Sequence, residues 1–319
     1  MSLTTILMTV FSTTFVYAAP LIFTALGGTF SERSGVVNVG LEGMMIIGAF
    51  GSTVFNLTFA STFGSLTPWI SLFIGALFGL VFSLLHAIAT VTFRADHIIS
   101  GTVLNLMAPA LAVFLTRVLY EGKGQTPVIN QSMGSFTFPI LSKIPFVGKV
   151  LFTNTSLIAF IAIIVGVLCW YFFFRTSLGL RMRSVGENPM AADTLGINVV
   201  KYKYMGVLIS GFFGGIGGAV MAQSITLNFS ASTISGQGFM SLAAMIFGKW
   251  NPLGATGAAL FFGLAQSLPI IGAYIPVLSH VNSVWFQIAP YAITIIVLVI
   301  FLGKAVAPAA DGQNYIKGK

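Results

Sequence analysis

Five polar side chains lie in or beside apolar segments of this sequence, where they could contact a polar solute: Asn38, Glu42, Asn105, Gln223 and Gln237. An ionised carboxyl group such as that of Glu42 costs about 2.5–3.5 kcal/mol at the centre of a bilayer, so it needs a partner, water or a proton. An acidic residue in the first turn of a helix is also favoured by the helix dipole. The five residues therefore predict either a polar route across a membrane or hydrogen bonds between helices.

The sequence lacks the motifs that would bind nucleotide or metal. The pattern GxxxxGK[ST] does not occur, because no Gly-Lys pair in the sequence is followed by Ser or Thr. We therefore expect no phosphate loop for ATP. There is no HExxH, no nucleophile elbow and no Cys/His cluster with metal-ligand spacing. We therefore expect no catalytic residue, no metal site and no cofactor bound by this chain. Glu42 is the only carboxylate placed clearly inside a span, which disfavours a proton relay and leaves sodium coupling open.

A dense polar segment, Arg175–Tyr204, lies between long apolar runs. Within it Asn188 can cap a short helix, Pro189 suits the first turn and Gly196 can end it. Such a helix would present an exposed Ala/Leu face at the membrane surface. The segment is either a helix that docks in a groove of a soluble partner or a well-capped cytoplasmic loop.

The elements that must position these residues are membrane-spanning helices. Charged residues are 7% and apolar residues 56% of the chain, whereas soluble domains have about 25% charged residues. The composition predicts an all-α polytopic membrane protein with a single transmembrane domain, 1–319, and about nine transmembrane or half-spanning helices. Because Lys and Arg separate apolar runs and form no basic stripe, we expect no nucleic-acid partner. The expected spans are 4–27, 38–59, 68–92, 98–118, 154–174, 204–222, a short one at 237–248, 253–273 and 285–303.

The distribution of Lys and Arg predicts the orientation. With a cytoplasmic loop at about 175–203 and an outside loop at about 119–153, eleven basic residues are cytoplasmic and four lie outside. The N-terminus is then outside and the C-terminus cytoplasmic. If the short segment 237–248 enters and returns on one side, everything after it changes side.

Two segments interrupt the spans, Phe30–Gly43 and Ser230–Phe247, and each is rich in Gly and polar residues before a shortened apolar run. In this orientation the helix before the first segment runs inward and the helix before the second runs outward. Interrupted helices in two inverted units are typical of inverted-repeat transporters.

The expected span 204–222 carries small residues at four-residue spacing, including Gly211, Gly214, Gly215 and Gly218. This spacing permits close approach of two helix backbones. It predicts a tight contact, either inside the chain or across a dimer interface.

Three motifs resemble the permease subunits of ATP-binding-cassette (ABC) importers, in the branch of simple-sugar, branched-chain amino-acid and nucleoside permeases. They are SERSGVVNVGLEGMMIIGAF at 31–50, LRMRSVGENPMAADTLGIN at 180–198 and GFMSLAAMIFGKWNPLGATGAALFFG at 238–263. The first is similar to the form in bacterial nucleoside permeases, and the resemblance covers nearly the whole chain.

The resemblance implies one permease subunit, not itself hydrolytic, in the cell membrane of a bacterium. Its partners would be an ABC ATPase that holds ATP and Mg, a second homologous permease and an external substrate-binding lipoprotein that delivers nucleosides. The coupling helix, which would rest in a groove of the ATPase, would comprise Gly186, Glu187, Asn188, Pro189, Ala191, Ala192, Asp193, Leu195, Gly196 and Ile197. Asn38, Glu42, Asn105, Gln223 and Gln237 would serve the substrate pathway. The alternatives are a simple-sugar ABC permease and a stand-alone ion-coupled secondary transporter.

Overall fold

The computed structural model describes residues 3–274, residues 306–317 and a few scattered positions between 285 and 299. Its first six α-helices are α1 (Leu3–Arg33), α2 (Leu41–Phe63), α3 (Thr67–Ala87), α4 (His97–Leu119), α5 (Val147–Leu151) and α6 (Leu157–Arg175). The next five are α7 (Ser177–Glu187), α8 (Pro189–Thr194), α9 (Val199–Met221), α10 (Gln237–Phe247) and α11 (Pro252–Tyr274). Both α3 and α9 continue into a π-helical turn, at Ile88–Thr92 and Ala222–Thr226.

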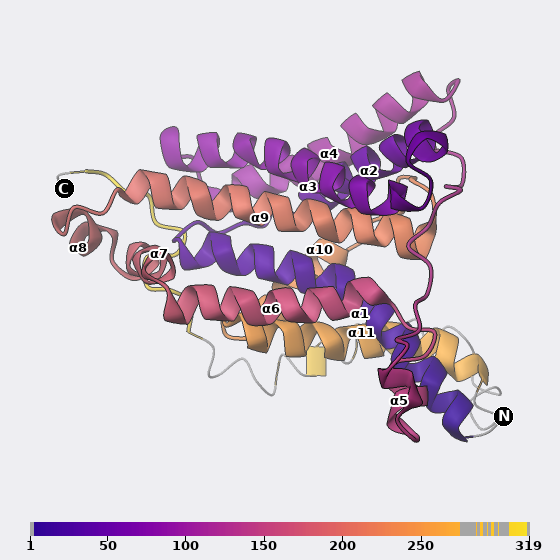
Figure 1. Cartoon of the computed structure of the whole chain (residues 1–319). Coiled ribbons are helices and arrows are strands. Elements are labelled where there is room, and N and C mark those ends of the chain that lie inside the picture. The colour runs from indigo at the N-terminus through magenta and orange to yellow at the C-terminus, as the bar shows by residue number, and fades with distance from the viewer. Residues whose placement is uncertain are drawn as a thin grey trace.

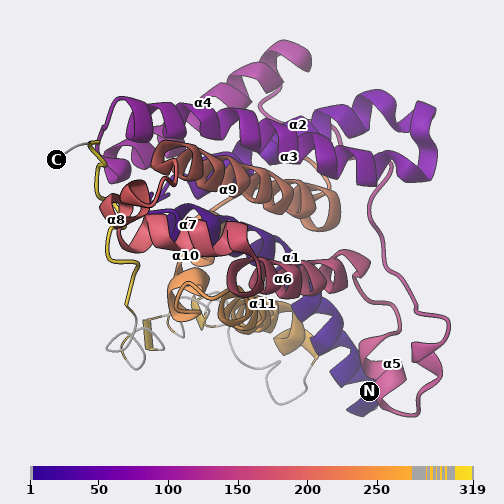
Figure 2. The same cartoon turned by 60° about the vertical axis from the view of Figure 1, so that its left-hand side comes forward.

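The long helices pack side by side in layers (Figures 1 and 2). α2, α3 and α4 form one layer, α9 separates this layer from α1, and α6 and α11 cover the other side of α1. α7, α8 and the segment 306–317 lie at one end of the bundle, here called the α8 end. The start of α1 and α5 lie at the opposite end, the α5 end.

The helical membrane fold expected from the sequence is confirmed. Six helical stretches of the described chain are long and apolar enough to cross a membrane, and one of them contains both α2 and α3. Eight expected spans each correspond to a helix with boundaries that differ by a few residues. The ninth, 285–303, lies outside the described residues apart from scattered positions. The chain is therefore an all-α, multi-pass membrane protein.

Both expected interruptions are present, but they differ in form. α1 continues through Arg33, so the first break is confined to residues 34–40. It leads into α2, which has 23 residues, so the expected shortened run after the first break is wrong. Of the two helices that follow the breaks, α10 is the short one, with 11 residues. α1 and α10 run toward the α8 end while α2 and α9 run away from it, so the two units have opposite directions.

The connection between α9 and α11 crosses from the α5 end to the α8 end. α9 starts at the α8 end, where Lys203 Nζ donates to the carbonyl of Gln313, 2.8 Å away. α10 finishes there too, because Arg33 at the end of α1 donates to the carbonyl of Trp250 at 2.9 Å. The 11 residues of α10 span about 16 Å, roughly half of a 30 Å hydrocarbon core, and the preceding segment 227–236 covers the remaining distance.

The glycines of α9 make contacts within the chain. A Cβ atom on Gly218 would lie 1.9 Å from the carbonyl oxygen of Met45 in α2. A Cβ atom on Gly48 of α2 would lie 2.5 Å from the carbonyl oxygen of Gly215. A Cβ atom on Gly215 would lie 2.3 Å from the carbonyl oxygen of Gly75 of α3. The four-residue spacing thus serves backbone packing of α9 against α2 and α3.

Candidate functional site

Glu42 joins the two interrupted segments. It lies in the first turn of α2, as expected, and its side chain is 7% exposed. Its two carboxylate oxygens accept hydrogen bonds from the backbone N–H groups of Gly236 and Gly238, each at 2.6 Å. These N–H groups belong to the first turn of α10, where the helix dipole favours a negative charge. The partner that a carboxylate within a bilayer requires is therefore the N-terminus of α10.

Asn105 lies on α4 beside this junction. Its Oδ1 accepts from the N–H of Gly43 at 2.9 Å, and its Nδ2 donates to the carbonyl of Val39 at 2.9 Å. Gly101 allows the close approach, because a Cβ there would lie 2.8 Å from the nitrogen of Gly40. Asn105 thus holds α4 against the start of α2.

Glu42 and Asn105 line one groove between α2, α4 and the residues that lead into α10. Ser235, Gly236 and Phe239 form the wall on the α10 side, and the groove has a volume of about 410 Å³. This volume is within the range of small-molecule sites, about 300–1,000 Å³. The groove combines apolar walls with a carboxylate, an amide and backbone groups, a composition that suits a polar aromatic or cyclic solute.

The other three expected pathway residues bond elsewhere. Asn38 is fully buried, donates to Ser210 Oγ at 2.9 Å and accepts from the N–H of Gly40 at 3.1 Å. Gln223 is fully buried in the π-helical turn after α9 and accepts from Asn56 Nδ2 at 2.6 Å. Gln237 begins α10 but accepts from Gln266 Nε2 on α11 at 2.9 Å. The structure therefore places only Glu42 and Asn105 together in the groove.

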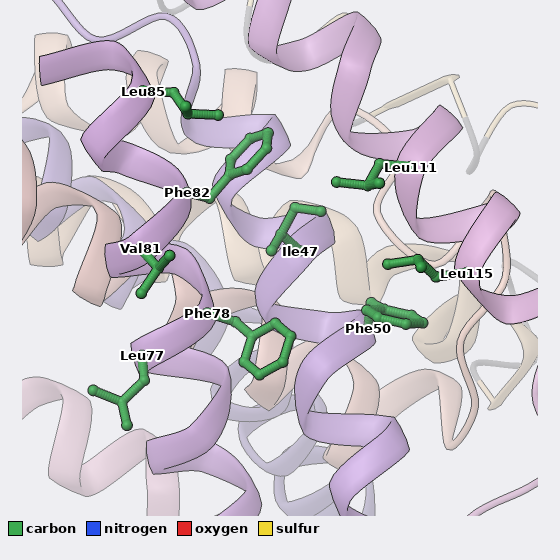
Figure 3. A pocket seen from close by; sticks show the side chains of 9 residues that line it. All are labelled: Ile47, Phe50, Leu77, Phe78, Val81, Phe82, Leu85, Leu111 and Leu115. Atoms are coloured by element: carbon green, nitrogen blue, oxygen red, sulfur yellow. The ribbon is translucent and has the colours of Figure 1, made fainter. Parts of the chain in front are cut away.

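A second groove, of about 430 Å³, lies between α2, α3 and α4 (Figure 3). Its lining consists only of apolar side chains: Ile47, Phe50, Leu77, Phe78, Val81, Phe82, Leu85, Leu111 and Leu115. It offers no hydrogen-bond partner to a polar solute, so desolvation of such a solute there would be uncompensated. The groove at Glu42 is consequently the candidate solute site.

The polar segment between α6 and α9 forms two short helices separated by the extended residue Asn188. α7 ends at Glu187, and Asn188 caps α8 by accepting from the N–H of Ala191 at 3.0 Å. Pro189 occupies the first turn, and Gly196, with φ of +78°, follows the helix and donates to the carbonyl of Asp193. The capping expected from Asn188, Pro189 and Gly196 is confirmed.

α8 presents an exposed apolar face at this end of the bundle. Leu195 is 80% exposed and Met190 is 40% exposed, while Ala192 faces inward and is buried. Gly186 is also buried, because it packs against the carbonyl of Arg33, to which a Cβ would be only 2.3 Å away. A short capped helix with an exposed leucine, fixed by Gly186 to the end of α1, can pass a displacement from a bound protein to the bundle.

Comparison with known proteins supplies the family. The family model described as branched-chain amino acid transport system / permease component matches residues 10–302. The chain belongs to this permease family. The permease is 62% identical to the nucleoside ABC transporter permease protein NupC of Lactococcus lactis, over 95% of each chain. It is 52% identical to the guanosine ABC transporter permease protein NupQ of Bacillus subtilis, over 100% of each. It is 30% identical to a putative glucose ABC transporter permease protein, TsgC13, of Haloferax volcanii, over 79% of this chain and 74% of the relative.

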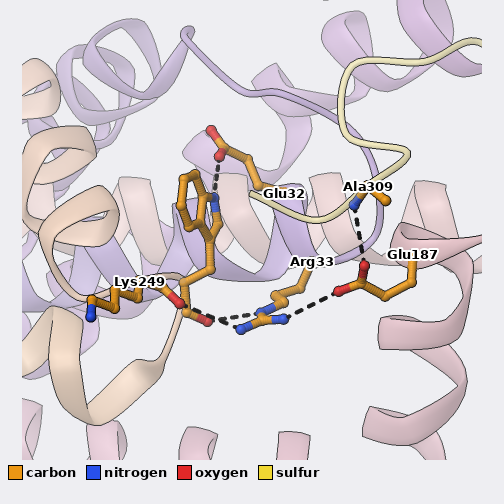
Figure 4. Close-up of polar contacts among 6 residues, drawn as sticks. Glu32, Arg33, Glu187, Lys249 and Ala309 are labelled. Carbon is orange, nitrogen blue, oxygen red and sulfur yellow. Dashed lines mark hydrogen bonds and ion pairs between the residues drawn. The ribbon is translucent and has the colours of Figure 1, made fainter. Parts of the chain in front are cut away.

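The partners of three polar residues at the α8 end were missed from the sequence: Glu32 and Arg33 (Figure 4), and Lys203. The carboxylate of Glu32 accepts from Trp250 Nε1 at 2.5 Å, and Arg33 lies 3.7 Å from the carboxylate of Glu187. Lys203, counted only as an orienting charge, is 3% exposed. The sequence does show that these charged residues lie directly beside apolar runs in a chain with few charges, which is the signal for a special role. It does not reveal their bonding partners, because those residues are distant in the sequence.

Within the described part of the permease, no group of three or more His, Cys, Asp or Glu side chains is arranged to hold a metal ion. The carboxylates at Glu32 and Glu42 instead bond to an indole N–H and to backbone N–H groups. The polar chemistry of the candidate site is therefore hydrogen bonding, with the carboxyl group of Glu42 and the amide of Asn105 as its side-chain groups.

Proposed function

We propose that this chain is a membrane-spanning permease subunit of an ATP-driven importer of nucleosides. The observation that carries the proposal is the full-length similarity to the nucleoside and guanosine permeases. The sugar permease relative is more distant and matches less of the chain, which favours nucleosides over simple sugars. An external substrate-binding lipoprotein would deliver the nucleoside.

ATP hydrolysis belongs to a partner in this proposal. An ABC ATPase that binds ATP and Mg would receive residues 186–197, called the α8 elbow or α7–α8 elbow below, with Leu195 as the main apolar contact because of its exposure. The other nine coupling residues named above, from Gly186 to Ile197, shape or surround this elbow. Helix-in-groove contact explains why a short, capped helix is exposed at the end of a membrane bundle.

Solute would pass the groove at Glu42 and Asn105. Asn38, Gln223 and Gln237 would act on the pathway indirectly, since they fix the first break, the end of α9 and the start of α10. α4 exposes Leu106, which lines this groove, and Phe114 and Val118 farther along the helix. A second, homologous permease subunit packed at this side would close the groove into a path between two subunits.

The proposed orientation places the α8 end in the cytoplasm and the α5 end outside. Arg33, Arg94, Arg181 and Lys249 gather at the α8 end, which supports this orientation by the positive-inside rule. The ATPase would then reach the α8 elbow, and the binding lipoprotein would approach the α5 end.

Purification in mild detergent tests the proposal. We expect the tagged chain to bring down a nucleotide-binding subunit, and hydrolysis of ATP by this complex to rise when guanosine-loaded binding protein is added. Deletion of Ala191–Leu195 should leave membrane insertion intact but remove the ATPase from the purified material and abolish uptake. Stimulation by a sugar and not by guanosine would support the sugar permease. Uptake by the purified chain alone in liposomes, driven by a sodium or proton gradient, would support the ion-coupled carrier and overturn the proposal.

A further inference from the structure

The segment 306–317, called the strap below, crosses the α8 end and binds the residues just before α8. The backbone N–H of Ala310 donates to the carbonyl of Gly186 at 2.9 Å. The backbone N–H of Ala309 donates to the Glu187 carboxylate at 3.2 Å (Figure 4). Ala310 is 4% exposed, so this part of the strap is packed into the bundle. One side of the strap is thus fixed to the two residues at which α7 turns into α8.

The other side of the strap binds the first break. Lys203 Nζ donates both to the carbonyl of Gln313 at 2.8 Å and to the carbonyl of Gly35 at 3.2 Å. A buried ammonium group that joins two carbonyls is a strong positional constraint, because loss of either bond leaves one of its buried N–H donors without an acceptor. Gly312 packs against Val37. Lys203 on α9 therefore ties the strap to residues 35–37.

A third contact reaches the turn between α3 and α4. Asn314 Nδ2 donates to the carbonyl of Arg94 at 2.8 Å. α4 begins three residues later and carries Asn105, which binds the start of α2. The strap therefore also contacts the turn that precedes α4, the helix that forms one side of the candidate solute groove.

Contacts continue from the strap to Glu42. The carbonyl of Val37 is 3.0 Å from His86 Nε2, and Asn38 accepts from the N–H of Gly40 at 3.1 Å. α2 starts at Leu41, and Glu42 follows in its first turn. A displacement of residues 35–37 is consequently transmitted within one or two turns to the junction of Glu42 with α10.

A direct contact between the coupling region and α1 exists as well, but it reaches less of the site. Gly186 packs against Arg33, and Glu187 pairs with Arg33 at 3.7 Å. This contact ends at the last turn of α1 and the first residues of the break. Within the described part of the chain, the strap adds hydrogen bonds that extend from the same two residues to Lys203 of α9 and to the α3–α4 turn, and it packs against Val37.

We infer that the strap is a coupling element, which transmits movement of the α7–α8 elbow to the first break and to α4, and thereby to the groove at Glu42. The inference rests on the proposed function, because the movement would come from the ATPase. The strap residues act by positioning other groups and need no contact with the solute.

The test uses the complete importer reconstituted in liposomes, with ATP hydrolysis and guanosine uptake measured on the same preparation. The main variant lacks residues 307–319. Asn314→Ala removes one contact, and Val306→Ala is its control on the strap, since Val306 is 85% exposed. Lys203→Met is paired with Lys201→Met, an exposed lysine on the same helix.

We expect the truncated chain to assemble with the ATPase and to hydrolyse ATP at about the wild-type rate, while uptake for each ATP hydrolysed falls about tenfold. Asn314→Ala and Lys203→Met should show the same uncoupling to a smaller degree, and both controls should match wild type. Unchanged uptake for each ATP in the truncated complex would overturn the inference. Loss of the ATPase subunit, with hydrolysis and uptake reduced in proportion, would also overturn it, because the strap would then be a docking or folding element.

The wild-type complex separates this result from a failure of the proposed function. If wild-type chain brings down no ATPase, or takes up guanosine without ATP, the proposed function fails and the strap inference falls with it. If the wild-type complex behaves as proposed, the variants decide the strap inference alone.

Discussion

Glu42 and Gly236 are far apart in the chain, yet the Glu42 carboxylate accepts the backbone N–H of Gly236 at 2.6 Å. This contact makes the start of α2 and the start of α10 a single unit. The same carboxylate faces the candidate solute groove. A solute that passes the groove therefore meets a group on which the position of two helices depends.

Glu42→Gln should weaken this junction. The amide group of glutamine would turn one acceptor into a donor that faces a backbone N–H, so one bond is lost and the other no longer involves a charge. Because hydrogen bonds to charged groups contribute about 1.5–3 kcal/mol, we expect a clear drop in the unfolding temperature in detergent and about tenfold slower guanosine uptake. Glu121→Gln, the same change on an exposed loop, is the control. A variant with wild-type stability and a changed KM alone would show that Glu42 contacts solute and does not hold the helices.

Leu195→Asp should separate the permease from its ATPase. Leu195 is 80% exposed at the end of α8, so the substitution places a charge on the expected contact surface without disturbing the core. We expect less ATPase subunit to copurify and uptake to fall at least about tenfold, as for loss of an interface hot spot. Leu66→Asp, at a residue 61% exposed on the α5 end, should leave both unchanged. Equal effects of the two substitutions would contradict a docking role for α8.

Attachment of the strap should depend on pH through Asp311. Burial raises the pKa of Asp311 to about 7, although its hydrogen bond to Glu32 of α1, the N–H of Gly312 and the charge of Lys203 on α9 lower it. A detached strap would have a carboxyl group of ordinary pKa, so between about pH 4 and 7 the attached state binds more protons. Attachment should therefore be strongest at the acidic end of this window, weaken as pH rises through it and level off above about pH 7.

Hydrogen exchange of the strap peptide, corrected for the intrinsic pH dependence, measures this effect. Protection of residues 306–317 should be greater at pH 6 than at pH 8, and Asp311→Asn should flatten the difference. The prediction is wrong if wild type and Asp311→Asn have the same profile.

Gly218→Ala should destabilise the bundle, because the new methyl group would lie 1.9 Å from the carbonyl oxygen of Met45. Overpacking of this kind costs about 1–3 kcal/mol when neighbours can shift, and more against backbone. Gly257→Ala on α11 is the matched control, since a Cβ there meets nothing within 4 Å and alanine favours a helix more than glycine does. Thermal unfolding in detergent should place Gly218→Ala below wild type and Gly257→Ala at or above it.

Much of the fold could be predicted because apolar runs report membrane spans directly. The helix at 97–119 and the short helix at 237–247 agree with the expected bounds within one residue at each end. The end of α1 was placed too early, since Glu32 and Arg33 look like loop residues until their partners Trp250 and Glu187 are known. The start of α9 at Val199 was also missed, although Asn198 gives a local signal as its N-cap, accepting from the N–H of Lys201.

The candidate site was less predictable, because the type of a residue and its position in a span do not reveal which group its side chain hydrogen-bonds to. Glu42 and Asn38 are four residues apart at one break, but one lines the groove and the other is enclosed beside Ser210. The short helix α8 was predictable in detail, since Asn188, Pro189 and Gly196 act through local backbone geometry. The strap was not, because the contacts that attach it to Gly186, Lys203 and Arg94 join residues far apart in the sequence.

The backbone contacts of Gly215 and Gly218 restrict which helices can slide. If α9 moved by one residue, about 1.5 Å along its axis, bulkier neighbours in its sequence would be driven against the backbones of α2 and α3. These three helices are therefore expected to rotate or translate together as a rigid block. α4 packs mainly on α2 through one face, and α10 is short and joined at its start by the Glu42 carboxylate. Opening and closing of the groove would then be a pivoting of α4 and α10 relative to that block, about the contacts that Asn105 and Glu42 make at the start of α2.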